Sequence, residues 1–390
     1  MVSTMGKWWE KRVQRLRALL EKVGRQGKAT SEPAYEQERP AAYEKSRAIF
    51  LQGLGLMFLV AFSSYFIQFE GLYGSQGILP LTEQLQLSRG LRWQLYPTIV
   101  RWHAALGIDE YLLCNFLAVL GLLVSSIAAI GFGTAPVIFA CCVLYLSLTT
   151  VGDVFMYFQW DALLLETGFL SVMYAPLWTR PRRSSQVPRV PLWMLRFLLF
   201  KLMLMSGVVK IASKDRVWQQ LTALSYHFAS QPIPTPMAWY LRQLHPLLLQ
   251  LGVALVFVIE IPVAFLLICP LRVVRHGAAG AVALLQVLIM VSGNYGFFNL
   301  LTLLLLVNLL DDTFWVSFLR EWEKDASDDR NVRGKGMYGS RGSNTSYLGS
   351  SPSSFPGSGT DVDPLQRRHG PRGYEYVGRK TPAFCWASLL

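Results

Sequence analysis

Repeated apolar runs constrain this chain more than any other feature of its sequence. A soluble protein has no need of such runs, whereas a transmembrane helix requires about 20 predominantly apolar residues. Within lipid each run must be helical, because an open strand edge leaves backbone polar groups without partners. The runs lie at approximately 46–67, 111–132, 135–151, 158–176, 192–211, 247–269, 277–294 and 297–310. The sequence therefore predicts an all-α fold, a multi-pass transmembrane helical bundle of about 7–8 spans.

The composition supports a membrane protein and argues against a nucleic-acid-binding one. Hydrophobic residues make up 52% of the 390 residues and charged residues 16%, against about 25% charged residues in soluble domains. The net charge of +12 arises from lysines and arginines at the ends of apolar runs and in both tails. That distribution follows the positive-inside rule, so the expected partner is the lipid bilayer and no nucleic acid is expected.

The chain divides into three segments by composition. Residues 1–45 are polar and basic, 46–312 hold the spans, and 313–390 form a low-complexity tail that we expect to be disordered. The basic first segment predicts a cytosolic N-terminus, which places the loops 68–110 and 212–246 on the opposite, lumenal side. Asn344 begins a glycosylation sequon. An odd number of spans would place it in the lumen and eight would place it in the cytosol.

Motifs for metal, cofactor or hydrolytic chemistry are not evident. The five cysteines form no CxxC, the five histidines form no HExxH, and the chain carries no GxSxG, P-loop or GxGxxG. The sequence therefore predicts no metal, no cofactor and no catalytic residue of these classes.

Charged and amide side chains inside the spans are the first candidate site, because such residues normally face the bundle interior and are paired. Lys201 is expected to pair with Glu166 or with Glu260. Asp161 points roughly 140° away from Glu166 around their shared helix, so this helix offers carboxylates in two directions. Two interpretations stay open, namely ion pairs that hold helices in register and polar groups that line a functional cavity. The predicted intramembrane polar network comprises Gln159, Asp161, Glu166, Lys201, Lys210 and Glu260.

The loop Ser213–Pro246, on the predicted lumenal side, is the second candidate site. It is rich in aromatic residues, and three prolines stiffen it because each fixes its own φ. A rigid aromatic surface of this kind can hold partly folded client chains through their unburied apolar patches. The alternative interpretation is an aromatic belt at the membrane interface.

Three ordered motifs resemble the lipase maturation factor family, over residues of about 46–312. They are GDVFMYFQWDALLLETGFLSVMYAPLW, LRFLLFKLMLMSGVVKIASKDRVWQQLTALSYHFASQPIPTPMAWYL and LQVLIMVSGNYGFFNLLTLL, preceded by GLYGSQGILP after the first span. The resemblance implies a non-enzymatic, chaperone-like, multi-pass protein of the endoplasmic reticulum membrane. It would help secreted lipases of the lipoprotein lipase type to fold, assemble into dimers and be secreted, with other folding factors of that compartment as further partners. Family members usually carry a large β-rich C-terminal domain, and here the low-complexity tail stands in its place.

The resemblance also points to residues in the second candidate site. Conserved family blocks fall on Asp215, Trp218, His227, Gln231 and Pro232, and the aromatic and proline content of the loop adds Tyr226 and Pro234. We expect these residues to contact the client.

A more distant likeness gives an alternative function. The pattern small-Gly-Val-x-Lys-Ile followed by Asp-x-x-Trp, here around Lys210, resembles the membrane domain of the vitamin K-dependent γ-carboxylase. That likeness implies a membrane enzyme in which Lys210 is a base towards vitamin K hydroquinone. From the residues alone, Lys210 either acts as a base in a poorly hydrated pocket or extends its ammonium to the interface.

Overall fold

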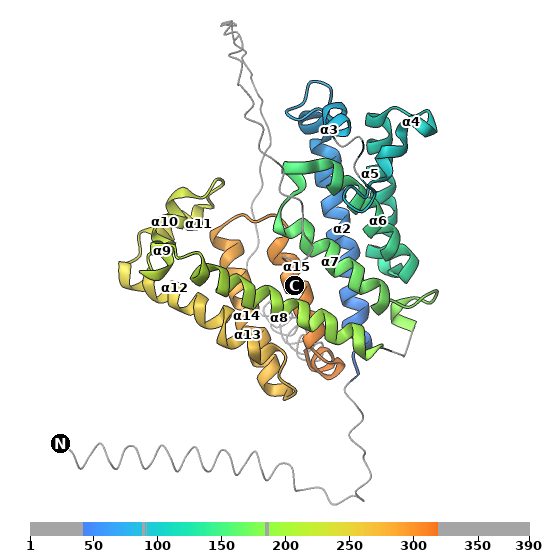
Figure 1. Ribbon diagram of the computed structural model, residues 1–390. Helices are drawn as coiled ribbons and strands as arrows, with labels where there is room; N and C mark the ends of the chain where they lie inside the picture. Colours follow the sequence, from blue (N-terminus) through green and yellow to red (C-terminus); the bar gives the residue numbers. More distant parts are fainter. Residues whose placement is uncertain (1–41, 88–89, 91, 184–186, 319–390) are drawn as a thin grey trace, which may run out of the picture. The chain divides into compact units, whose positions relative to one another are not determined.

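The computed structural model describes residues 42–87, 90, 92–183 and 187–318, and every regular element within these ranges is helical (Figure 1). Most of the predicted basic segment, most of the predicted disordered tail and Asn344 lie outside the described residues. Within the described ranges, the prediction of an all-α multi-pass bundle is confirmed.

The helices fall into two groups by their place in the fold. The apolar helices of the bundle are α2 (Glu44–Tyr73), α5 (Glu110–Ile127), α6 (Ala135–Gly152), α7 (Gln159–Tyr174), α8 (Arg189–Ala212), α12 (Pro246–Glu260), α13 (Pro262–Leu267), α14 (Arg272–Ser292) and α15 (Phe298–Leu306). The short connecting helices are α3 (Leu81–Leu87), α4 (His103–Leu106), α9 (Arg216–Gln219), α10 (Ala223–Ser230) and α11 (Pro236–Arg242).

Six helical segments of the described chain are long and apolar enough to cross a membrane, and a bent pair at residues 298–318 raises the number to seven. The predicted run 158–176 forms α7, which at 16 residues is shorter than these spans. The predicted run 247–269 is interrupted between α12 and α13, where Pro262 has no N–H to donate to the preceding turn.

Successive helices of the bundle run in opposite directions, apart from α12 and α13, which form one interrupted span, so the bundle has two ends. We call the end where α2 begins the proximal end and the end where α2 finishes the distal end. Asp312 bonds to the first residues of α2, so residues 44 and 312 both lie at the proximal end, as an even number of passes between them requires. The segment 213–245 lies at the distal end, after α8 has returned from the proximal side (Figure 1).

Helix α2 packs against α5, α6, α7 and α15, and α8 contacts α7, α12, α13 and α15. The aromatic rings of Phe58 and Phe62 on α2 both meet the ring of Tyr145 on α6 edge to face. The close approach of α2 to the turn after α5 requires Gly55, since a Cβ there would lie 2.5 Å from the backbone nitrogen of Ala129. These contacts place α2 and α8 at the centre of the fold, with Arg47 of α2 and Arg196 of α8 buried between helices.

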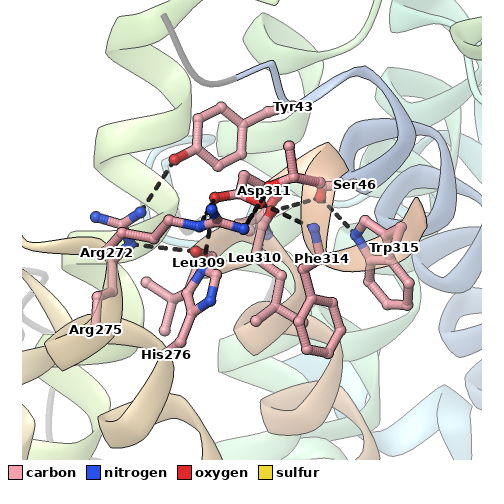
Figure 2. Close-up of polar contacts among 12 residues, drawn as sticks. Tyr43, Ser46, Arg272, Arg275, His276, Leu309, Leu310, Asp311, Phe314 and Trp315 are labelled. Atoms are coloured by element: carbon pink, nitrogen blue, oxygen red, sulfur yellow. Dashed lines mark hydrogen bonds and ion pairs between the residues drawn. The ribbon is translucent and has the colours of Figure 1, made fainter. Parts of the chain in front are cut away.

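A hydrogen-bonded joint closes the proximal end by connecting the first and last helices of the bundle. The Asp312 carboxylate accepts backbone N–H groups of Glu44 and Lys45 at 3.0 and 2.9 Å. These N–H groups have no partner inside α2, so an external carboxylate satisfies them and favours the positive end of the helix dipole. Ser46 donates its hydroxyl to the Leu310 carbonyl at 2.6 Å and accepts the indole N–H of Trp315 (Figure 2).

Two buried arginines at the same end bind main-chain carbonyls, whereas Arg272 pairs with the Asp311 carboxylate. Buried Arg275 donates to the carbonyls of Leu309, Cys269 and Pro270 and to the Tyr43 hydroxyl (Figure 2). Arg196, 3% exposed, donates to the Asn308 carbonyl at 2.9 Å, and its guanidinium lies over the ring of Tyr43. Carbonyls at helix C-termini carry partial negative charge and lack partners within the helix, which suits them to bind cations.

We expect Asp312→Ala to lower the free energy of unfolding by about 2 kcal/mol, because it removes a charged cap from α2. Asp312→Asn keeps an oxygen acceptor and should lose less. Thermal unfolding of the purified protein in detergent micelles measures both variants. Unfolding midpoints equal to that of the unmodified protein for both variants would show that the joint does not stabilise the fold.

Candidate functional site

The two lysines of α8 bind two different acids. Lys201 donates to Glu166 of α7, with Nζ and Oε1 2.5 Å apart. The lysines are nine residues apart, or about 13.5 Å along the helix axis, so they lie at different depths in the bundle. Glu166 is one of the two partners that the sequence predicted for Lys201. The second predicted partner, Glu260, pairs with Lys210 instead.

Lys210 forms the more enclosed of the two pairs. Its ammonium donates to both carboxylate oxygens of Glu260, at 2.8 and 2.7 Å, and to the Ser206 carbonyl at 3.1 Å. The exposed fraction of the side chain is 20% for Lys210 and 7% for Glu260. The Lys210 ammonium is therefore bound to the Glu260 carboxylate of α12. It does not extend to the membrane interface, which was one of the two possibilities that the sequence left open for Lys210.

The break between α12 and α13 places Glu260 where Lys210 can reach it. Glu260 is the last residue of α12, and Pro262 begins α13. Gly207 of α8 lies against this break, since a Cβ at that position would be 2.5 Å from the Ile261 side chain. The absence of a side chain at residue 207 thus allows α8 to approach closely enough for the pair to form.

Helix α9 covers the Lys210–Glu260 pair from the distal side. Asp215 caps α9 by accepting the Val217 N–H at 2.9 Å. The ring of Trp218 lies 5.2 Å from the Lys210 ammonium and meets Phe257 of α12 edge to face. A cation over an aromatic face gains electrostatic stabilisation. Asp215 and Trp218, which the sequence assigned to client contact, thus have positions that support the ion pair.

Asp161 and Gln159 differ from the prediction of one connected network. Asp161 is 3% exposed and accepts the Tyr145 hydroxyl of α6 at 2.5 Å, whereas Gln159 is exposed at the first turn of α7. The angular separation along α7 explains the difference, because it turns Asp161 towards α6 while Glu166 reaches α8. The residues of the predicted network thus form two separate ion pairs and an aspartate–tyrosine hydrogen bond in place of a single network.

The distal segment 213–245 is bound to the end of α14. Gln231 donates to the Ser292 carbonyl at 2.9 Å, and Thr235 donates to the Val291 carbonyl at 2.8 Å. His227 and Tyr295 stack with an interplanar angle of 12°, and the imidazole Nε2 lies 2.9 Å from the tyrosine hydroxyl. The last carbonyls of a helix have no partner within it, so these bonds satisfy α14 and fix the segment together.

His227 and Gln231 therefore hold the segment, although the sequence assigned them to the client. Sequence reasoning did not single out Thr235, which also accepts the Ala238 N–H as the N-cap of α11. The available signal was a threonine directly before a proline, which is typical of a helix start.

Apolar side chains remain exposed on the outer surface of this segment. Tyr226, Trp239 and Tyr240 are each more than 60% exposed, and Pro232 and Pro234 are exposed between them. An open cavity of about 400 Å³ lies between α10 and α11. The residues lining this cavity are Phe228, Ala229, Pro234, Thr235, Pro236, Trp239 and Arg242.

Comparison with known proteins relates the chain to one family over its membrane region. A family model described as the lipase maturation factor transmembrane domain matches residues 45–317. Lipase maturation factor 2 of Homo sapiens is 45% identical over 284 residues, which is 68% of this chain and 40% of that protein. Lipase maturation factor 1 of Mus musculus is 33% identical over 279 residues, which is 68% of this chain and 48% of that protein.

The matched region thus spans less than half the length of these relatives. No solved structure matches the chain.

We expect Lys210→Met to lower the free energy of unfolding by about 3 kcal/mol, because it leaves the Glu260 carboxylate buried without a cation. The double variant Lys210→Met with Glu260→Met should recover most of this loss. Lys201→Met, at the more exposed pair, should cost about 1 kcal/mol or less. Thermal unfolding in detergent measures all three variants, and equal losses for both single variants would contradict the difference in burial.

We expect stability to fall as the pH drops through about 6.5, in part through His227. Burial lowers the pKa of His227 below its ordinary value of 6.5. The unfolded chain then binds the proton more readily, so the contribution of neutral His227 is present above pH 6.5 and is lost as pH falls towards the lower folded pKa. His227→Gln should show a smaller decrease in unfolding midpoint between about pH 7.5 and 5.5. Identical pH profiles for both proteins would contradict this assignment.

Proposed function

Because the chain belongs to the lipase maturation factor family, we propose that it is a membrane-bound factor in the maturation of secretory lipases. The match over residues 45–317 carries the proposal, since it includes both ion pairs and the whole bound distal segment. The clients proposed are lipases of the lipoprotein lipase type, which the factor helps to fold, to assemble into dimers and to be secreted.

The proposed location is the endoplasmic reticulum membrane, with the N-terminus and the proximal end in the cytosol. The charge distribution supports this orientation, because the sequence before α2 is rich in lysine and arginine, and basic residues also lie in the connection before α8 and in the first two turns of α14. The distal end then faces the lumen, where secretory lipases fold. Residue 312 lies on the cytosolic side in this arrangement, as does the start of α2.

The distal segment is the proposed client-binding surface, and no covalent step is involved. Exposed aromatic groups such as Trp239 and Tyr240 offer apolar contact area to a chain that has not buried its own. The bonds from Gln231 and Thr235 to α14 hold this surface in one conformation, so less entropy is lost when a client binds. Other folding factors of the same compartment are further partners in this proposal.

The position of Lys210 favours this function over the carboxylase-like alternative. A general base has to present a free amine to its substrate, whereas both oxygens of Glu260 hold the Lys210 ammonium. Lys210 therefore serves in the proposed function as a structural support for α12 and α9.

A rescue experiment tests the proposal in cells from which the endogenous lipase maturation factor has been removed. We expect the 390-residue chain to restore the ratio of secreted lipase activity to secreted lipase mass. Lys210→Ala should fail, with a reduced level of the factor, because Glu260 loses its partner. Lys210→Arg should rescue, because arginine pairs with Glu260 but is a poor base.

Lys45→Ala, at an exposed lysine of the proximal end whose side chain makes no ion pair in the described chain, is the matched control and should rescue fully. Failure of Lys210→Arg at a normal protein level would favour the enzyme. Failure of the unmodified chain would overturn the maturation role.

A further inference from the structure

Arg242 provides the only charged side chain in the lining of the distal cavity. Phe228 of α10 and Trp239 of α11 form aromatic walls, and Pro234 and Pro236 form the rim. Within the part of the chain that the structure describes, the Arg242 guanidinium makes no ion pair and no hydrogen bond, and the residue is exposed. The cavity thus combines apolar walls with one cation available for an external partner.

The charge of the surrounding segment has the same sign. Residues 213–245 contain Lys214, Arg216 and Arg242 against a single acid, Asp215. The Asp215 carboxylate accepts the Val217 N–H at the start of α9, away from the residues that line the cavity. An acidic ligand is therefore complementary to this surface, and a basic one would be repelled.

The rim of the cavity is held in place before any ligand arrives. Thr235, between the two rim prolines, donates to the Val291 carbonyl and accepts the Ala238 N–H. Each proline also fixes its own φ, so few backbone states remain to be lost on binding. At about 400 Å³ the cavity lies near the lower end of the size range of small-ligand pockets, which suits an aromatic or aliphatic side chain.

We propose that this cavity binds an extended acidic–apolar peptide segment of the client, resting on the proposed maturation function. An aromatic or aliphatic side chain of the segment enters between Phe228 and Trp239. A neighbouring carboxylate of the segment pairs with Arg242, in the two-pronged geometry that a guanidinium offers to a carboxylate. Buried aromatic anchors and arginine are the residue types that dominate the energetics of protein interfaces.

A peptide fits the observations better than an anionic lipid does. Anionic lipids are concentrated in the cytoplasmic leaflet, which lies at the proximal end in the proposed orientation. The distal cavity faces the opposite leaflet, where an acidic ligand comes mainly from protein.

Peptide binding to the full chain in neutral detergent micelles tests the proposal. The probes are three fluorescent peptides that differ at one position beside a phenylalanine, which holds Asp, Asn or Lys, and fluorescence anisotropy gives each Kd. We expect the Asp peptide to bind about ten-fold more tightly than the Asn peptide, because a charge-assisted hydrogen bond is lost with Asn. The Lys peptide should bind most weakly.

Variants of the cavity separate its cation from the rest of the surface. Arg242→Gln should abolish the preference for Asp over Asn. Ala229→Asp, which adds a carboxylate to the lining, should weaken binding of the Asp peptide by a similar factor. Arg216→Gln removes a cation of the same segment outside the cavity, and should keep the preference.

An unchanged preference in Arg242→Gln overturns the proposal, and so does a preference lost equally in Arg216→Gln. Equal affinity for all three peptides, together with Arg242-dependent binding to phosphatidylserine vesicles, would assign the cavity to a lipid and also overturn it. The rescue experiment in cells distinguishes the failure of this proposal from the failure of the proposed maturation function. If the unmodified chain rescues lipase maturation but binds the three peptides equally, only the proposed peptide ligand of the cavity is rejected. If the unmodified chain fails to rescue, the maturation function is rejected.

Discussion

A charge at bilayer depth has no water to bind, so the bundle itself has to neutralise it. This chain does so in two ways. Lys201 and Lys210 of α8 each take a carboxylate from a neighbouring helix, α7 in one case and α12 in the other. Arg196 and Arg275 take carbonyls from the ends of helices instead. Both solutions join elements far apart in sequence, so neutralising the charges also determines which helices are neighbours.

The distal surface depends on these same interactions. Lys210 holds Glu260 of α12 and lies beneath Trp218 of α9, from which the segment 213–245 continues. At its other side, that segment is bonded to the final carbonyls of α14. A surface built from short helices and prolines has little core of its own. It is held by its hydrogen bonds to α14 and by the contact of Trp218 with the Lys210 ammonium.

Most of the helices and one ion pair were predictable from sequence, because they depend on local hydropathy and on spacing along one helix. The apolar runs at 46–67 and 192–211 form α2 and α8, and Lys201 forms an ion pair with Glu166, one of its two predicted partners. The roles of Arg196, His227 and Gln231 were not predictable, since their partners are main-chain carbonyls or a distant tyrosine. Any residue type offers a carbonyl, so no residue pattern reveals such a bond. The break at Pro262 did have a local signal in the proline itself.

The carboxylate of Asp312 at the start of α2 has a consequence for biosynthesis. Synthesis proceeds from the N-terminus, so α2 is made first while its cap lies 268 residues further along the chain. Until the ribosome has produced that residue, the leading N–H groups of α2 have no protein partner from the last helix. The bundle is therefore closed only after its final pass has been made.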